Sequence, residues 1–512
     1  MKKFLMVVLL SFIITVTTVI SCSCSKNYDY VVQFFAAGKL VATKYFYSGD
    51  FVGSLPEYNE EGFSLLSWKY KDGTKVNEKD VVTANISVDA KLSYSYNKTE
   101  DTNISEDEKE KMQIADRLNF STAAGKYISN HDIEIINDLK IKEIDFSGAE
   151  FENSTLKESA FENNKNIEYI VLPKSLKNIS KEAFKNCINL KELVFSEGLE
   201  IIGDSSFYNI GISDIILPNS VKNIGKNAFS CCKKLENITL DDKVDDIDVT
   251  FIDGSDMLTK INVVDGGKYF SDNGALYISE SGVDGLGNDI ITHKLIRVPE
   301  GKSGEFKMFS KTGIISSHSM YNCKKLTSLI LSSDESSRGA EIEEYAVFGC
   351  ENITKVKLSS ALKYIGDYAF YGCTNLTTIN MEETKVENIG ECAFIGANNL
   401  FTITLPSTIS EIKKQAFYNL RNLEEVNFVE NENNLKIKDN AFSKISYIKT
   451  ISIDLSKVQN VTEVGDTAFG RAYVSTILKD PNIVEVYVHN KLTFDTSFKD
   501  NYENLEYITK QK

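Results

Sequence analysis

The sequence predicts a solenoid of stacked coils, mainly β or α/β in class, with a parallel sheet along one face and a small β module before it. Along most of the 512 residues an aromatic residue returns about every 23 positions. Each interval also holds one short strand-like run and a turn. Because a unit of this length cannot bury its apolar edge alone, consecutive units must stack.

The returning aromatic is the Phe of an Ala-Phe pair within Leu-x-x-Ile-Gly-x-x-Ala-Phe-x-x-Cys, as in "LKYIGDYAFYGC" (362–373). Met320 and Val347 occupy the same register. We predict that this aromatic fills the interior of each coil and forms a structural core column. The residues of the column are Phe161, Phe184, Phe207, Phe229, Phe370, Phe394, Phe417, Phe442 and Phe469.

A strand-like run precedes the aromatic in each unit and reads Leu-x-x-Ile-x-Leu, as in "LKELVF" (190–195). Alternation and β-branched residues predict a strand. If these strands are parallel and repeat at this period, the first Leu or Ile of each strand would lie beside the first Leu or Ile of the next strand. The predicted strands start at Ile141, Ile167, Leu190, Ile212, Leu235, Leu258, Leu326, Ile353, Leu376, Leu400, Leu423, Ile448, Ile483 and Leu505.

These units resemble the BspA-type leucine-rich repeat, which occurs in surface proteins of bacteria and some protozoa. The resemblance runs from near Leu139 to the end and implies an N-terminal cap with the first strand at 121–146 and repeats at 147–512. "KYFSDNGALYISE" and "HKLIRVPEGKSGEF" resemble the β-hairpin excursion that the family inserts between repeats, which implies one at about 265–306.

The first residues predict export. Lys2 and Lys3 precede an apolar run that ends in "VISC" (19–22), a pattern typical of a signal peptide. "VISC" resembles a bacterial lipobox. This implies a lipoprotein signal at 1–21, lipid attachment at Cys22 and a tether at 22–27, with a plain cleaved signal as the alternative. Ser23 favours the outer membrane and the cell surface.

Residues 28–95 lack the repeat and alternate like strands between turns. They resemble the internalin-type B-repeat (Listeria–Bacteroides repeat), which implies a small β-grasp-like surface module in which Trp68 packs in the core. The matching residues are Gly62, Phe63, Trp68, Asp72, Gly73, Val81 and Ala90. Residues 96–120 form an acidic linker, in which Ser105 and Glu108 predict a capping box for a short helix through Leu118.

The net charge of −16 argues against nucleic acid and against an anionic membrane surface as partners, so the lipid is the expected membrane contact. The repeat position three residues after the aromatic holds Cys187, Cys232, Cys323, Cys350 and Cys373. We interpret these thiols as core packing, and a Cys350–Cys373 disulfide is the alternative. The isolated His residues and the Cys spacings predict neither a metal site nor a cofactor.

Outward positions of the predicted strands supply the candidate binding site. Val171, Val194 and Ile216 occupy one such position in consecutive coils and could form an apolar strip beside Tyr169. The alternative is that β-branched residues only suit the sheet. The carboxylates that would favour a basic partner are Glu168, Glu192 and Asp214.

Together these features predict a non-enzymatic bacterial cell-surface lipoprotein that binds host or extracellular macromolecules, as an adhesin does. The expected partner is a protein, and a glycan is the alternative partner. A structural or self-associating protein of the cell envelope is the alternative from a different class. Since no catalytic motif occurs but Asp and Glu are plentiful, a glycan-binding protein or a glycosidase is the third alternative.

Overall fold

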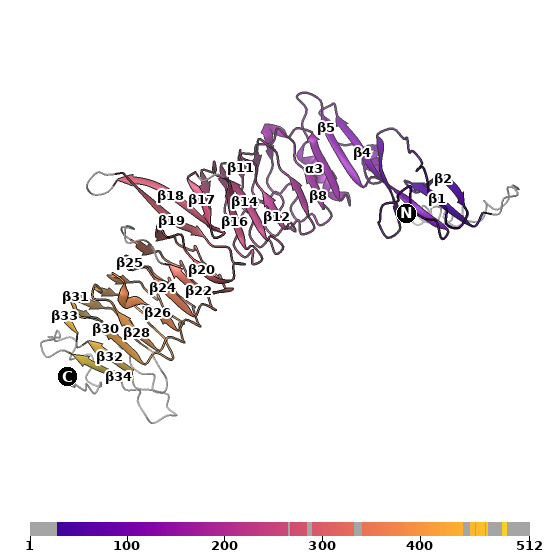
Figure 1. Cartoon of the computed structure of the whole chain (residues 1–512). Coiled ribbons are helices and arrows are strands. Elements are labelled where there is room, and N and C mark those ends of the chain that lie inside the picture. Colours follow the sequence, from indigo (N-terminus) through magenta and orange to yellow (C-terminus); the bar gives the residue numbers. More distant parts are fainter. Residues whose placement is uncertain are drawn as a thin grey trace, which may run out of the picture. The chain divides into compact units, whose positions relative to one another are not determined.

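The computed structural model describes residues 28–264, 267–283, 289–331, 340–443, 451–455, 457–465, 467–468 and 484–488 (Figure 1). It divides into two compact units. One holds the residues up to Tyr96 together with Glu106–Leu118, and the other holds Asn97–Ser105 together with the residues from Asn119 onward. Cys22, the predicted site of lipid attachment, lies outside the described residues.

The first unit is a mixed sheet in the order β3-β4-β1-β2. Its parallel pair is β1 with β4, and its other pairs are antiparallel. Trp68 is 1% exposed, meets Phe34 edge-on at 5.1 Å between ring centroids and donates from Nε1 to the Pro56 carbonyl at 2.9 Å. The strands are β1 (Tyr30–Ala36), β2 (Lys39–Phe46), β3 (Phe63–Tyr70) and β4 (Ile86–Lys98).

The short helix in the acidic linker, α2 (Glu106–Met112), ends before the predicted Leu118. Residues Arg117–Thr122 form strand β5 instead. The reason is a change of period, because Leu118 and Phe120 are buried and alternate with polar neighbours, which suits a strand and not a helix.

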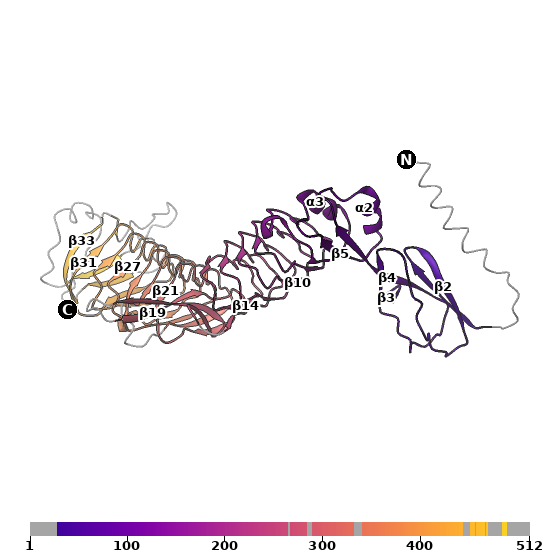
Figure 2. The same ribbon diagram turned by 90° about the horizontal axis from the view of Figure 1, so that it is seen from above.

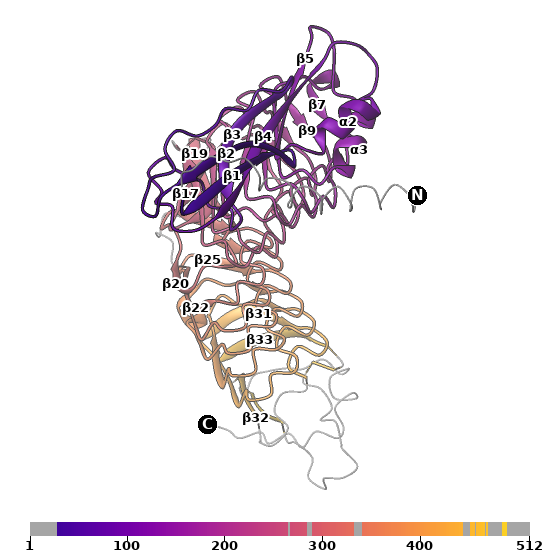
Figure 3. The ribbon, with the colours of Figure 1, turned by 90° about the vertical axis from the view of Figure 1, so that its right-hand side faces the viewer.

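A cap covers the start of the coils in the second unit and consists of α3 (Asn130–Asp138) and β6 (Glu143–Gly148). Figure 3 shows α3 near β7 (Thr155–Leu156). The helix begins with a capping box in which the Ser129 hydroxyl accepts from the backbone N–H of Asp132. The buried Asp132 also pairs with the buried Lys98. Burial opposes ionisation of Asp132, but Lys98, Ser129 and backbone N–H groups outweigh it and hold its pKa low.

Beyond the cap, each coil contributes one strand to a parallel ladder along one side (Figure 1). Every predicted run except that at Leu505, which is outside the described residues, contains one of these strands. Hydrogen bonding between neighbours is interrupted at β10/β12, β16/β20 and β26/β28. The strands after β6 are β8 (Tyr169–Val171), β10 (Glu192–Val194), β12 (Asp214–Ile216), β14 (Asn237–Asp241), β16 (Lys260–Val264), β20 (Gly304–Lys307), β22 (Leu326–Leu331), β24 (Lys355–Leu358), β26 (Thr378–Ile379), β28 (Thr402–Leu405), β30 (Glu425–Phe428), β32 (Ile451–Leu455) and β34 (Val484–Val488).

A second parallel ladder runs through the same coils (β27, β31 and β33 in Figure 2). The predicted class, a mainly β parallel solenoid with a period of about 23, is confirmed, but the sequence predicted a sheet on one face only. After β7 this ladder holds β9 (Asn178–Ile179), β11 (Ile201–Ile202), β13 (Asn223–Ile224), β15 (Asp246–Ile247), β21 (Thr312–Ile315), β23 (Ala340–Ile342), β25 (Leu362–Ile365), β27 (Asn388–Ile389), β29 (Glu411–Ile412), β31 (Asn431–Ile437) and β33 (Val458–Val464). It consists of two sheets, because β15 and β21 do not pair with each other. Short 3-10 turns occur at η1 (Glu152–Ser154) and η2 (Met381–Glu383).

The repeated Phe residues stack inside the coils. In the first run, from Phe161 to Phe229, the centroids of consecutive rings lie 5.3 Å apart and the ring planes are within 11° of parallel. In the second run, from Phe370 to Phe442, the centroids of consecutive rings lie 5.2 Å apart and the ring planes are within 8° of parallel. All eight are at most 1% exposed, and Met320 and Val347 are equally buried in the same register. Phe469 lies outside the described residues.

The excursion between the two runs of Phe is an antiparallel meander of β17 (Tyr269–Asp272), β18 (Ala275–Val283) and β19 (Asp289–Arg297) (Figure 1). It ends earlier than the predicted residue 306, because the residues after Arg297 form a further coil with β20. Val298 takes the Phe position there. Its N–H donates to the Ser319 carbonyl at 2.7 Å, as that of Phe184 does to Ser206.

Candidate binding surfaces

The predicted apolar strip lies on outward positions of the first ladder. Val171 pairs with Val194 across β8 and β10, while Ile216 is on β12, which pairs with β14. Ile216 is 74% exposed and Val194 45%, whereas Val171 is half-buried. Tyr169 is also half-buried and lies opposite Glu192. The structure therefore exposes two large apolar side chains one coil apart and covers the start of the strip more.

The three carboxylates beside the strip differ in how far they are neutralised. Glu168 lies 2.5 Å from the ammonium of Lys191 and 2.9 Å from that of Lys142, which hold its pKa low. Asp214 accepts from the Asn237 amide at 2.8 Å and from the Ser213 hydroxyl at 2.8 Å, and these bonds lower its pKa. Glu192 is exposed. Since Glu168 already has two cations, Glu192 and Asp214 are the carboxylates that could attract a basic partner.

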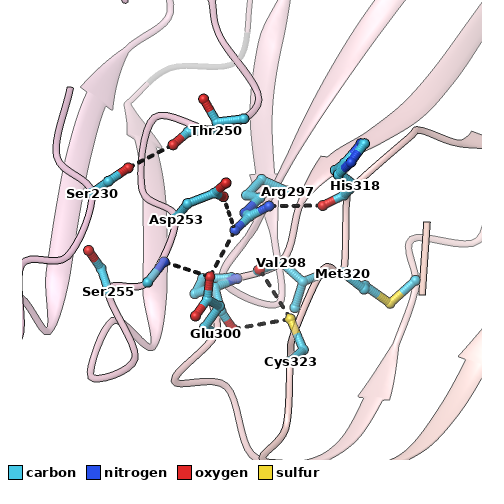
Figure 4. A network of polar contacts seen from close by, with 12 residues as sticks. Ser230, Thr250, Asp253, Ser255, Arg297, Val298, Glu300, His318, Met320 and Cys323 are labelled. Carbon is cyan, nitrogen blue, oxygen red and sulfur yellow. Dashed lines mark hydrogen bonds and ion pairs between the residues drawn. The ribbon is translucent and has the colours of Figure 1, made fainter. Parts of the chain in front are cut away.

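An ionic cluster around a buried arginine lies where the hairpin returns to the coils (Figure 4). Arg297 is fully buried and its guanidinium lies 2.5 Å from Asp253 and 3.1 Å from Glu300. Both carboxylate contacts are made by Nη2, and Nη1 donates to the His318 carbonyl at 2.8 Å. Glu300 also accepts from the Gly254 N–H at 2.8 Å. Burial raises the pKa of both Asp253 and Glu300.

This cluster ties together three consecutive coils, because Asp253, Glu300 and His318 belong to different ones. This cluster was not predicted from the sequence. An Arg three residues before a Glu, in a chain whose cations are mostly Lys, was the available signal. The contact between residues 253 and 297 could not be inferred, since the hairpin separates them.

The family is decided by the repeats. The sequence model described as the BspA type leucine rich repeat region matches six copies, at residues 154–276, 302–385 and 382–487, which is more than half of the chain. The chain belongs to the BspA-type leucine-rich repeat family. The resemblance of the repeats is thus confirmed, while the B-repeat resemblance of residues 28–95 stays a prediction.

The chain is also similar to solved structures of leucine-rich repeat proteins. A leucine-rich repeat protein from Eubacterium ventriosum is 18% identical, with 76% of this chain and 94% of that one covered and a TM-score of 0.49. A second leucine-rich repeat protein, from Bacteroides ovatus, is 17% identical, with 83% of this chain and 94% of that one covered and a TM-score of 0.40. A leucine-rich cell surface protein from Faecalibacterium prausnitzii is 15% identical, with 88% of this chain and 97% of that one covered and a TM-score of 0.37. No curated protein matches the sequence.

The repeated cysteines of this BspA-type chain are buried and carry free thiols, Cys350 and Cys373 included. Each thiol donates to the carbonyl of the Phe position one coil earlier. For Cys187 the acceptor is Phe161 at 3.1 Å, and for Cys350 it is Met320 at 2.9 Å. The thiols therefore act as small core residues that satisfy a buried carbonyl.

We expect these thiols to resist alkylation in the folded protein. Burial raises the pKa of Cys187, Cys232 and Cys373 to about 12 and that of Cys350 well above its usual value, so few thiolates form. Iodoacetamide treatment at about pH 8 followed by peptide mass spectrometry should find all four unmodified until urea is added. Modification of Cys350 in the native protein would contradict this packing.

Leucine-rich repeat proteins are typically non-enzymatic scaffolds. Over the described ranges, no group of His, Cys, Asp and Glu side chains could hold a metal ion.

A pocket of about 240 Å³ lies between α3 and β7, and its lining includes Ser129, His131, Phe151 and Lys157. Among all the residues that the structure describes, no helix is long and apolar enough to cross a membrane.

Proposed function

We propose that this protein is an adhesin-like, non-enzymatic binding protein of the bacterial cell surface that captures an extracellular or host protein. The exposure of Ile216 and Val194 on consecutive coils is the observation that supports this most directly. Neighbouring exposed apolar side chains on a soluble protein often mark an interaction site. Glu192 and Asp214 beside them favour a partner with basic groups.

Family membership supports a protein-interaction role in general and leaves the partner open, because function on a repeat scaffold lies in its variable surface. Attachment through a lipid at Cys22 is part of the same proposal and is based on the sequence pattern at 19–22. Protease treatment of intact cells tests the location. Removal of the protein from the surface supports the proposal, and protection would place the anchored protein on the periplasmic side.

Replacing Val171, Val194 and Ile216 together by Ser should weaken binding to a matrix protein by about ten-fold or more, as loss of central apolar contacts does. Binding of the purified mature protein to a panel of immobilised extracellular-matrix proteins is the measurement. The matched control changes Ile330, Thr404 and Asn427, in the same strand position of later coils, to Ser and should bind normally.

Self-association distinguishes the envelope-assembly alternative. If static light scattering shows oligomers that the Val171, Val194 and Ile216 variant loses, while no matrix protein binds, the strip joins copies of the chain. If the variant folds and binds the matrix protein unchanged, the strip is not the binding site.

A further inference from the structure

A second surface, which we call the aromatic platform, consists of six half-buried rings in three consecutive coils. His318, Tyr345 and Tyr368 occur two residues before the Phe position and stack at 5.1 and 4.9 Å between centroids. The second column occurs one residue after the Phe position and stacks at 5.0 Å in both steps. Its members are Tyr321, Phe348 and Tyr371.

The fold does not require aromatic residues at these positions. Tyr345 and Tyr368 have positive φ values of 55° and 56°, which bulky side chains rarely adopt. His318, a residue type more common in this region, has a φ of 59°. The equivalent residues of earlier coils, Ser205 and Asn227, have φ of 51° and 54°. Since small polar residues meet the same backbone demand, the rings at the strained positions are unexplained by coil geometry alone and suggest a use.

Stacking decides which part of each ring a ligand can reach. Tyr345 and Tyr368 lie within 3° of parallel, and Phe348 and Tyr371 within 4°. The inner ring faces are therefore covered by their neighbours, and rims and hydroxyls remain. The hydroxyls of Tyr321, Tyr345 and Tyr371 have no hydrogen-bond partner among the described residues. A sugar ring, which packs on an exposed aromatic face, would find few such faces here.

Carboxylates adjoin the aromatic platform in the sequence. Glu344, Asp367 and Glu391 each immediately precede the positive-φ residue of their coil. Glu344 is exposed, and Asp367 is 3.1 Å from the Lys413 ammonium. The Cys392 thiol, with a smaller effect of Glu391, raises the pKa of Tyr368 to about 12, so this hydroxyl stays protonated.

We propose that the aromatic platform docks an extended polypeptide segment rich in Lys or Arg. The aliphatic stems of such side chains pack on ring rims, and their cationic ends reach tyrosine hydroxyl oxygens and the carboxylates of Glu344 and Glu391. Rings fixed by stacking lose little side-chain freedom on binding, which favours affinity. This surface is separate from the apolar strip of Val171, Val194 and Ile216, so the inference does not depend on the function proposed for that strip.

Fluorescence anisotropy of the mature protein with labelled (Lys-Ala)4 and (Glu-Ala)4 peptides tests the proposal. The basic peptide should bind, more weakly as salt rises, and the acidic one should not. Changing Tyr345 and Tyr368 together to Asn, the residue found at Asn227, should weaken binding at least ten-fold without unfolding the coil. Changing Glu344 and Glu391 to Gln should also weaken it.

Controls separate this surface from others. Phe401→Ser removes an exposed ring that lies outside the two columns and should leave binding unchanged, as should the Ser variant of the Val171, Val194 and Ile216 strip. Equal binding of both peptides, no binding of either, or an unchanged affinity in the Asn variant would overturn the proposal. So would binding of labelled cellohexaose that the Asn variant loses, which would assign the rings to a glycan.

Discussion

Replacing Phe394 by Ala is expected to lower the free energy of unfolding by about 3–5 kcal/mol, as truncation of a large core aromatic does. Phe394 is 0% exposed and lies 5.2 Å from both Phe370 and Phe417 in the interior stack. The variant loses two stacked pairs and leaves a void that rigid coils cannot close. Urea unfolding followed by far-UV circular dichroism measures the change.

A nearby exposed ring provides the control. Phe401 is 49% exposed, so Phe401→Ala should change stability by about 0.5 kcal/mol or less. Because a coil contacts mainly its neighbours, hydrogen exchange in Phe394→Ala should also rise most in the coils next to residue 394. An unfolding midpoint equal to that of the unchanged protein would show that the Phe stack does not hold the coils together.

The first ladder and the Phe stack could be predicted from sequence because the same requirement recurs in every coil. One aromatic and one alternating run per period are visible without any knowledge of contacts. The second ladder was missed because strands such as Asn178–Ile179 have two residues, too few to show a period of two. The coil that begins at Val298 was missed because Val replaces the expected Phe.

Part of the surface could have been foreseen from the period. Lys191 follows Glu168 by 23 residues, as Tyr368 follows Tyr345, so both contacts join equivalent positions in consecutive coils. Comparing the outward columns for charge, and not only the strand column for apolar residues, would have shown that Glu168 is paired. The exposure of Ile216 follows from alternation, but the closer covering of Val171 depends on packing at the start of the coils.

Changing Arg297 to Met is expected to cost about 3 kcal/mol at neutral pH, because two partly buried carboxylates lose the cation that compensates them. This is the low end for breaking a buried ion pair, since the Asp253 side chain is 32% exposed. Arg297 is fully buried against Asp253 and Glu300. The His318 carbonyl would lose its guanidinium donor as well. The unfolding free energy of the variant, compared with that of the unchanged protein in urea, gives the cost.

The pH dependence identifies the cause. Burial raises the pKa of Asp253 and Glu300 in the folded state, so the folded protein binds these protons more readily than the unfolded chain. For such groups the stability is highest below the unfolded pKa and falls as pH rises through the folded pKa. Without Arg297 both pKa values should rise further, so the cost of Arg297→Met should be smaller at about pH 4–5 than at pH 7.

Neutralising the acids as well distinguishes a charge effect from a packing effect. In a triple variant with Arg297→Met, Asp253→Asn and Glu300→Gln, no uncompensated charge remains buried, and most of the lost stability should return. The triple variant should also lose the pH dependence of the single variant. A cost that is equal at both pH values and persists in the triple variant would mean that the volume of Arg297, and not its charge, joins the hairpin to the coils.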